Sequence, residues 1–390
     1  KELFLYSLND LDNFFLFLST YYQTKLYERE SLIIFDEVQL FPRARSAIKY
    51  LVADGRYDYV ETGSLMSIKK NVQDILIPSE EYHLQMYPMD FEEFLWAMGN
   101  DVLMPFIKNC FEKRKAVGAA LHRQIMTYFR KYLIVGGMPQ AVLKFVATEN
   151  FEETDRIKRN IINLYRNDII KHAAGYERKV ESIFDEIPGQ LQKHEKKFKL
   201  ASVEKGARFR DYEDALFWLD DAMITNPCYN ADEPNIGLKM SSSKNTLKCY
   251  MADTGLLISH CFDENGIVSE QLYKKLLFDK LEVNEGMFME NIVAQMLRAA
   301  GHKLYFYSVS SRTAENRMEI DFLIAKKEVT SRHNISPIEV KSGQRYTMNS
   351  LRKFLMKYKE YLAEAYVVHT QDLKQEDGIT FIPVYMVPLL

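Results

Sequence analysis

Apolar residues group along the chain into segments whose spacing predicts regular structure. Four consecutive apolar residues between polar ones in residues 31–39 predict a strand buried on both faces, as in a parallel α/β sheet. Residues 57–64 predict a second strand that ends in hydroxyl side chains. Few Gly or Pro residues interrupt residues 101–175, so we expect mainly helices there.

Residues 176–260 have the pattern of a winged-helix module. Apolar residues recur at helical spacing over residues 209–223, which predicts an amphipathic helix. Residues 224–229 and 247–251 then predict the two strands of a wing.

The last part of the chain predicts helix, strand, strand, helix. Residues 282–300 predict a helix whose apolar face includes Glu290. Residues 318–324 alternate as a strand with Glu319 and Asp321 on one face. Residues 338–341 predict a second strand, on which Glu339 and Lys341 share a face, and residues 348–363 a closing helix.

The composition is that of a globular chain. With 390 residues, of which 47 % are hydrophobic and 27 % charged, we expect two to four domains and neither a disordered nor a fibrous protein. The net charge of −3 excludes a uniformly basic nucleic-acid coat but leaves room for a local basic patch. The four cysteines form no CxxC pair, so neither a zinc ribbon nor a disulfide scaffold is expected. No run of 18 uncharged apolar residues predicts a membrane span, and a cytoplasmic location is expected.

Two acidic residues follow the strand in residues 31–39. Ligands of open α/β sheets bind at the carboxyl ends of the strands. Asp36 there can hold Mg²⁺ and Glu37 can orient a water, as in a Walker B element. From the adjacent strand, Thr62 or Ser64 can reach a γ-phosphate or its water. The alternative is an ordinary buried strand with acids at its end.

Several motifs in one order closely resemble a large prokaryotic family of AAA-type ATPases that carry a C-terminal domain of unknown function. The resemblance covers nearly the whole chain. It implies an ATP- and Mg²⁺-using AAA-type domain. The motifs are Phe35-Asp36-Glu37-Val38-Gln39, Phe41-Pro42-Arg43-Ala44, Thr62-Gly63-Ser64-Leu65, Tyr87-Pro88-Met89-Asp90-Phe91-Glu92-Glu93-Phe94 and Tyr132-Leu133-Ile134-Val135-Gly136-Gly137-Met138-Pro139.

The chain departs from this family at its start. Members carry a glycine-rich phosphate-binding loop, but no Gly precedes Gly55 here. The loop would lie upstream of Lys1, and without it the chain cannot bind ATP in the usual way. We expect the complete reading frame to encode that loop.

The strongest chemical signal lies near the C-terminus. Paired strands would bring Asp321, Glu339 and Lys341 together, and Glu290 can add a carboxylate. Carboxylates bind Mg²⁺ or Mn²⁺, and a lysine can polarise the attacking water. This is the spacing of PD-(D/E)xK nucleases, and the family's C-terminal domain resembles that restriction-endonuclease-like fold. The alternative is a Glu–Lys ion pair in a structural core, with the acids tied to basic partners. An unpaired Glu290 would cost several kcal/mol (order of magnitude), so a compensating group is expected nearby.

A basic excess precedes the helix predicted at 209–223. Such charges suit phosphate contacts, but the acidic helix behind them does not, and winged helices also bind proteins. Contact with nucleic acid and contact with a protein both remain open. The basic residues are Lys193, Lys196, Lys197, Lys199, Lys205, Arg208 and Arg210.

We therefore expect an α/β multidomain protein with four parts. Residues 1–100 are the C-terminal part of an AAA-type core, 101–175 a helical lid or linker, 176–260 winged-helix-like and 261–390 nuclease-like. One hypothesis is an ATPase that regulates a metal-dependent nuclease acting on DNA or RNA. The second is an ATP-controlled switch or scaffold whose inactive nuclease-like domain binds a protein or DNA. The third is a DNA-binding module without chemistry. An oligomer is compatible with each.

Overall fold

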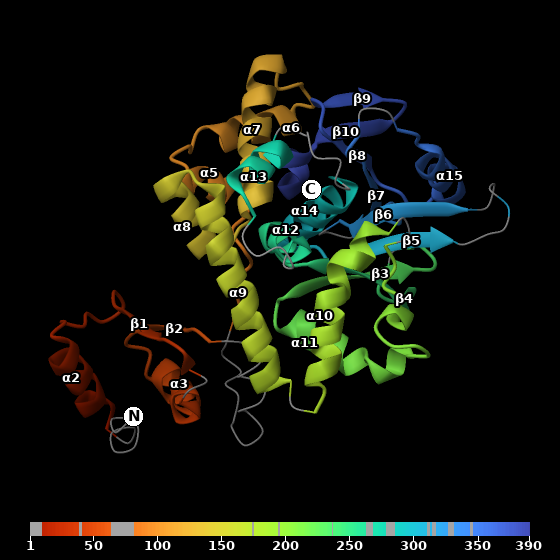
Figure 1. The fold of residues 1–390 in the computed structure, drawn as a ribbon. Coiled ribbons are helices and arrows are strands. Elements are labelled where there is room, and N and C mark those ends of the chain that lie inside the picture. Colours follow the sequence, from red (N-terminus) through yellow and green to blue (C-terminus); the bar gives the residue numbers. More distant parts are fainter. Residues whose placement is uncertain are drawn as a thin grey trace. The chain divides into compact units, whose positions relative to one another are not determined.

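The structure is a computed structural model of the whole chain. It describes residues 10–38, 41–63, 82–173, 175–193, 196–235, 237–262, 268–277, 285–309, 313, 317–326, 331–343 and 346–390. The chain divides into two compact units, Lys1–Met86 and Tyr87–Leu390, and each is described by itself (Figure 1). The predicted phosphate-contacting Ser64 lies outside the described residues.

The N-terminal unit is a small α/β structure. Strands β1 (Leu32–Phe35) and β2 (Asp58–Glu61) pair in parallel, as the sequence predicts for a Walker B strand and its neighbour. Helices α2 (Leu11–Tyr22) and α3 (Pro42–Asp54) supply the core. Gly55 ends α3 in the left-handed conformation that glycine adopts without strain.

The prediction that β1 is buried on both faces is wrong for its described residues. Ile33 and Phe35 pack against the core formed by α2 and α3, whereas Leu32 is 54 % exposed and Ile34 is 59 % exposed. The reason is that alternate side chains of a strand point to opposite faces, and the described core covers one of them.

The C-terminal unit begins with helices, as predicted for residues 101–175. Asp90 and Glu93 form a capping box at the start of the first one, which satisfies backbone N–H groups that a helix start leaves free. The helices are α5 (Phe91–Ala97), α6 (Leu103–Glu112), α7 (Ala119–Val135), α8 (Pro139–Thr148), α9 (Phe151–His172), α10 (Glu177–Gln192), α11 (Glu213–Asp221), α12 (Thr254–Cys261), α13 (Glu270–Leu277), α14 (Glu285–Ala299) and α15 (Asn349–Tyr358).

A mixed sheet forms the centre of this unit. Its eight strands lie in the order β4-β3-β5-β6-β7-β8-β10-β9. Both parallel and antiparallel pairs occur, and the structure is therefore of the α/β class, as predicted. The strands are β3 (Thr225–Ala231), β4 (Ser242–Met251), β5 (Tyr305–Val309), β6 (Met318–Ala325), β7 (Ile335–Val340), β8 (Ala365–His369), β9 (Lys374–Glu376) and β10 (Ile379–Pro383).

Helices cover both faces of the sheet. On one face, Leu351 and Phe354 of α15 pack with Met318 and Ile320 of β6. On the other, α14 runs close to β3, β4 and β7 (Figure 1). Because strand side chains alternate, Glu319 and Asp321 of β6 point away from α15.

The two strands predicted as a wing are present as β3 and β4. They pair antiparallel, with Cys228 opposite Lys248. They are also part of the large sheet, since β3 pairs in parallel with β5. Local periodicity predicted both strands, but it carries no information about the sheet that they join.

The C-terminal segment packs into the helical part. Asp372 accepts hydrogen bonds from the backbone N–H groups of Val117 and Gly118, just before α7. The final 3₁₀ turn, Val384–Leu389, buries Tyr385, whose hydroxyl lies 2.9 Å from Nδ1 of His122. The described helices that lead the unit and the strands that end it therefore share one core. Every helix among the described residues is too short or too polar to traverse a lipid bilayer.

Candidate functional site

The predicted nucleotide residues meet at the ends of β1 and β2. The Thr62 hydroxyl donates a hydrogen bond to Oδ1 of Asp36, and the backbone N–H of Glu37 donates to Thr62 Oγ1 at 3.1 Å. Both acidic side chains are exposed. The sequence thus predicted correctly that these residues come from neighbouring parallel strands.

Glu37 adopts an uncommon backbone conformation. Its φ angle is 53°, in the left-handed region that side chains with a Cβ rarely occupy. Such a conformation costs about 1–2 kcal/mol and often marks functional turns. It turns the chain directly after β1.

The C-terminal acidic residues gather around a lysine, which we call the acid–lysine cluster. It comprises Lys196, Lys248, Glu290, Glu319, Asp321, Glu339 and Lys341. Lys248 comes from β4, Glu290 from α14, Glu319 and Asp321 from β6, and Glu339 from β7. Strands β6 and β7 pair antiparallel, as the predicted site requires.

Lys248 lies at the centre of the cluster and is 1 % exposed. Its Nζ is 3.1 Å from Glu319 Oε1, 3.7 Å from Asp321 Oδ1 and 3.8 Å from Glu290 Oε2. Burial acts to lower the pKa of Lys248, but the three carboxylates outweigh it and raise the pKa well above its ordinary value. Lys248 is therefore a permanent cation in this core.

Glu290 has the compensating partners that its place on an apolar helix face requires. Lys196 forms an ion pair with its Oε1, and the Tyr250 hydroxyl donates to its Oε2 at 3.0 Å. Burial acts to raise the pKa of Glu290, but Lys248 and Lys196 outweigh it and hold the pKa below its ordinary value. Glu290 is thus ionised and fully paired.

Asp321 and Glu339 are less well compensated. Asp321 Oδ2 accepts a hydrogen bond from the Val340 backbone N–H at 2.8 Å, and Glu339 Oε1 accepts one from Lys341 Nζ at 2.6 Å. Burial, and then repulsion from Glu290, raises the pKa of Asp321 to about 6. Burial, and then repulsion from Asp321, raises the pKa of Glu339 to about 8. Glu339 Oε2 is buried and has no hydrogen-bond partner in the described structure.

The predicted Mg²⁺ or Mn²⁺ ligands were Glu290, Asp321 and Glu339. Their contacts do not fit a metal ion, because both oxygens of Glu290 and of Asp321 face a lysine, a tyrosine hydroxyl or a backbone N–H. Within the described ranges, no three His, Cys, Asp or Glu side chains are placed to hold a metal. The cation among these carboxylates is Lys248.

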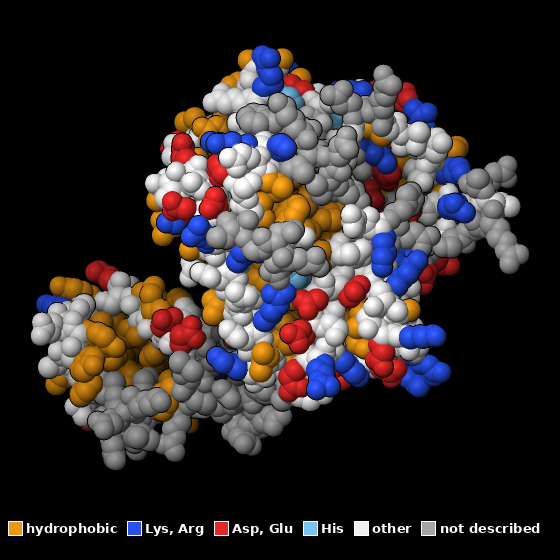
Figure 2. Space-filling view, viewed as in Figure 1, with side chains coloured by type: hydrophobic (Ala, Val, Ile, Leu, Met, Phe, Trp, Pro, Cys, Tyr) orange, Lys and Arg blue, Asp and Glu red, His pale blue; other side chains and the backbone are white. Residues whose placement is uncertain are grey.

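The residues predicted to contact nucleic acid are in different environments. Lys196 is engaged with Glu290 inside the acid–lysine cluster, so its ammonium is not placed for a phosphate. Lys197 is partly buried, while Lys193, Lys205, Arg208 and Arg210 are exposed. Figure 2 shows basic and acidic side chains interspersed over the part of this unit around α10 and α11. This face is mixed in charge.

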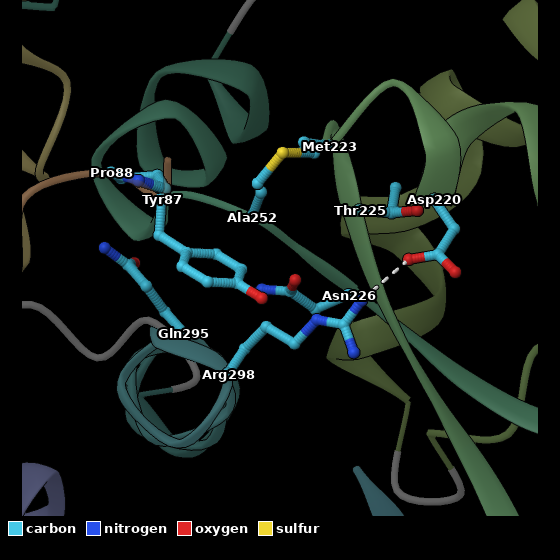
Figure 3. Close-up of a pocket in the computed structure, with 9 residues that line it drawn as sticks. All are labelled: Tyr87, Pro88, Asp220, Met223, Thr225, Asn226, Ala252, Gln295 and Arg298. Atoms are coloured by element: carbon cyan, nitrogen blue, oxygen red, sulfur yellow. Dashed lines mark hydrogen bonds and ion pairs between the residues drawn. The ribbon is translucent and has the colours of Figure 1, made fainter. Parts of the chain in front are cut away.

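A small space lies beside α14 where the chain enters the C-terminal unit. Tyr87 and Pro88 line it with Gln295 and Arg298 of α14, and Arg298 pairs with Asp220 at 3.4 Å (Figure 3). Its volume of about 10 Å³ holds at most one water. This space is too small for a substrate.

Sequence reasoning missed Lys196, Lys248 and Glu319 as members of the cluster. It also missed Tyr250 as a hydrogen-bond donor to Glu290. A signal for Lys248 and Tyr250 existed, because they are two residues apart in the predicted strand 247–251, whose other residues are apolar. A lysine in such a strand needs an anionic partner, by the argument applied to Glu290. Which carboxylate it meets depends on the sheet order, and local patterns do not contain that order.

Comparisons with known families match three parts of the chain. Residues 1–95 match an AAA domain, residues 126–265 a domain of unknown function (DUF8612) and residues 285–387 another domain of unknown function (DUF4143). Together the matches support an AAA-type family with domains of unknown function, which is the family that the motifs resemble. The AAA match suggests an ATPase-like, nucleotide-binding function that uses ATP and Mg²⁺.

Other comparisons add little. No curated protein matches the chain. One solved structure, "Crystal structure of protein VC1899 from Vibrio cholerae", aligns over 92 % of this chain and 88 % of that one, with 11 % identity. Its TM-score of 0.19 is too low to support any argument about fold or function.

Proposed function

We propose that this protein is an ATP-controlled switch. In this proposal the N-terminal unit hydrolyses ATP, and the C-terminal unit has a nuclease-like fold that binds a partner without cleaving it. The observation that carries the proposal is the buried ammonium of Lys248 among the carboxylates of Glu290, Glu319 and Asp321. A cluster neutralised from within is suited to holding strands and helix together.

The proposal also includes the folds of three parts of the chain. We infer that the N-terminal unit is part of an AAA-type core, that residues 176–260 are winged-helix-like and that residues 261–390 are restriction-endonuclease-like. Supporting this are the parallel pair β1 and β2, the antiparallel pair β3 and β4, and the order helix, three strands, helix from α14 through β5, β6 and β7 to α15.

For the ATPase we assign Asp36 to Mg²⁺, usually through water, and Glu37 to the attacking water. Both carboxylates are exposed, which fits groups that must meet a hydrated ion and a nucleotide. The Thr62 hydroxyl fixes the orientation of Asp36. Bound Mg²⁺ would neutralise phosphate charge. The proposal requires a phosphate-binding loop, and no Gly precedes Gly55 in this sequence.

The partner is a nucleic acid or a protein. The exposed cations Lys193, Lys205, Arg208 and Arg210, with the partly buried Lys197, would supply phosphate contacts. Acidic side chains on the same face favour a protein partner instead. Location in the cytoplasm and assembly into an oligomer remain parts of this proposal.

A second candidate is an ATP-regulated, Mg²⁺- or Mn²⁺-dependent nuclease. Two observations favour it. Lys341 donates a hydrogen bond to Glu339, whose strand pairs with the strand of Asp321, and Glu339 Oε2 has no hydrogen-bond partner in the described structure. In that account Asp321 and Glu339 bind the metal and Lys341 polarises the attacking water.

Cleavage of labelled DNA and RNA separates the two candidates. We would incubate the product of the complete reading frame with single- and double-stranded substrates, ATP, and Mg²⁺ or Mn²⁺. The switch predicts no cleavage but partner or nucleic-acid binding that changes between ATP and ADP. Glu37→Gln should abolish ATP hydrolysis and fix the protein in its ATP-bound behaviour.

Cleavage that disappears in a folded Asp321→Ala variant would establish the nuclease and contradict the switch. The Asp211→Asn variant, changed at the mixed-charge face, is the control for a general effect of losing a carboxylate. Binding that ATP and ADP affect equally would also contradict the switch.

A further inference from the structure

The acid–lysine cluster gathers the kind of carboxylates that a metal centre uses, but a lysine ammonium lies between them. Carboxylates from α14, β6 and β7 converge, and one buried oxygen, Glu339 Oε2, has no partner in the described structure. The place where these carboxylates face each other holds the Nζ of Lys248, within 3.1–3.8 Å of three of them.

Lys248 cannot leave this position at low cost. It is 1 % exposed, and its ammonium lies 5.2 Å from the centre of the Phe306 ring, so the ammonium itself is buried. In such surroundings the attraction between an ammonium and carboxylates is much stronger than in water. A divalent ion at the same oxygens would meet the repulsion of a neighbouring positive charge at short range.

The charges of the neighbouring side chains also favour the Lys248 ammonium over a metal ion. Lys196 and Lys341 bring two more cations, paired with Glu290 and Glu339 respectively. Three lysines therefore face four carboxylates. The charge is close to balanced without any added ion.

We propose that Lys248 is the built-in counter-cation of this cluster and that its ammonium keeps divalent metal ions out. This proposal rests on the proposed switch function and deepens it, because it states why the nuclease-like unit does not cleave. The cluster is a latent metal site. Removing the positive charge of Lys248 exposes Glu290 Oε2, Glu319 Oε1 and Asp321 Oδ1 to a new cation beside Glu339 Oε2.

Mn²⁺ titration of the nucleotide-free protein, followed by electron paramagnetic resonance, tests this directly. The variants are Lys248→Met, which keeps the length of the side chain, Lys248→Arg, which keeps the charge, and Lys248→Met combined with Asp321→Asn. All carry Asp36→Asn, so that the N-terminal unit contributes no bound ion.

We expect Lys248→Met to bind one Mn²⁺ per chain at least about tenfold more tightly than the protein with Lys248. Lys248→Arg should bind no more than the parent, and the added Asp321→Asn should abolish the gain. Tight, stoichiometric binding of Mn²⁺ by the parent would overturn the proposal. A folded Lys248→Met variant that gains nothing would overturn it too.

The parent protein decides the question if Lys248→Met does not fold. Absence of a stoichiometric Mn²⁺ site in the parent then supports exclusion, and its presence contradicts it. Failure here is distinguishable from failure of the switch. The titration uses neither ATP nor a partner, whereas the switch is tested by the effect of ATP on binding.

Discussion

Lys248 and Glu339 are both buried and ionisable, but they differ in the number of oppositely charged partners. Three carboxylates hold Lys248 in its charged form, whereas Glu339 has a single lysine partner and an unpartnered oxygen. Its pKa is raised to about 8 because burial and the charge of Asp321 both disfavour the carboxylate. Glu339 is therefore the member of the cluster whose protonation state changes near neutral pH.

This raised pKa predicts a pH-dependent stability. The folded protein retains a proton on Glu339 that the unfolded chain releases at lower pH, so the stabilisation is complete below the unfolded pKa. It is lost as the pH rises through about 8. Urea unfolding should show stability falling over this window, and Glu339→Gln should remove on the order of 1 kcal/mol of the decrease.

The exposed Glu376 of β9 provides the control for this experiment, and Glu376→Gln should keep the parent's pH dependence. An unchanged slope in Glu339→Gln would show that Glu339 is ionised throughout, which contradicts a raised pKa for this carboxyl.

Among single residues, the sequence predicted four of the seven members of the acid–lysine cluster: Glu290, Asp321, Glu339 and Lys341. The place of Glu290 on an apolar helix face required a partner, and the partners exist. Their identity was not predictable, because Lys248 is 42 positions before Glu290 and meets it through the packing of α14 on β4.

Among the elements, α7 and α8 are joined by a closely packed turn. Gly137 accepts a backbone hydrogen bond from Met89 at 2.7 Å, and a Cβ on Gly137 would overlap the Met89 carbonyl. Asp253 accepts a hydrogen bond from the Gly137 N–H at 2.6 Å, and Tyr132 donates one to the Met89 carbonyl at 2.9 Å. The Gly136-Gly137 motif thus joins α7 to α12 and to the segment that enters the unit.

Gly137→Ala should therefore destabilise the C-terminal unit by roughly 1–3 kcal/mol, because backbone rather than a flexible side chain obstructs the new methyl group. Gly189→Ala is the matched control. Gly189 lies within α10 with open space around it, so alanine there should leave stability unchanged or raise it by up to about 1 kcal/mol. Thermal unfolding measures both, and equal effects would contradict the close packing at Gly137.

Periodicity predicted β3, β4, β6, β7 and the helix that carries Glu290, but not β5, β8, β9 or β10. It did not predict that β3 and β4 extend the C-terminal sheet, since a strand's partner is set by long-range packing. For the same reason a four-residue apolar run did not reveal that one face of β1 is exposed.

In the whole molecule, the boundary between the two units falls after an exposed stretch. Tyr82 is 91 % exposed, Leu84 is 76 % and Met86 is 78 % exposed, whereas Tyr87 begins the compact C-terminal unit. Exposed apolar side chains on extended backbone are good protease substrates. Limited chymotrypsin digestion should therefore cut first between residues 82 and 86.

The resulting fragment, residues 87–390, should unfold in one transition at the temperature that this unit shows in the intact chain. Its helices and its sheet share a core, as the contacts of Asp372 and Tyr385 show. Two separate transitions in the fragment would mean that the helical part and the sheet fold independently, contrary to the single core.

The central claim is that Lys248 holds the acidic residues of the C-terminal unit together, and a double-mutant cycle tests it most directly. Glu319 has the carboxylate closest to Lys248, at 3.1 Å, and has no role in the nuclease hypothesis. Urea unfolding of Lys248→Met, Glu319→Gln and the double variant should show a coupling energy of about 1–3 kcal/mol. Additive effects would mean that Lys248 is not the cation that these carboxylates require.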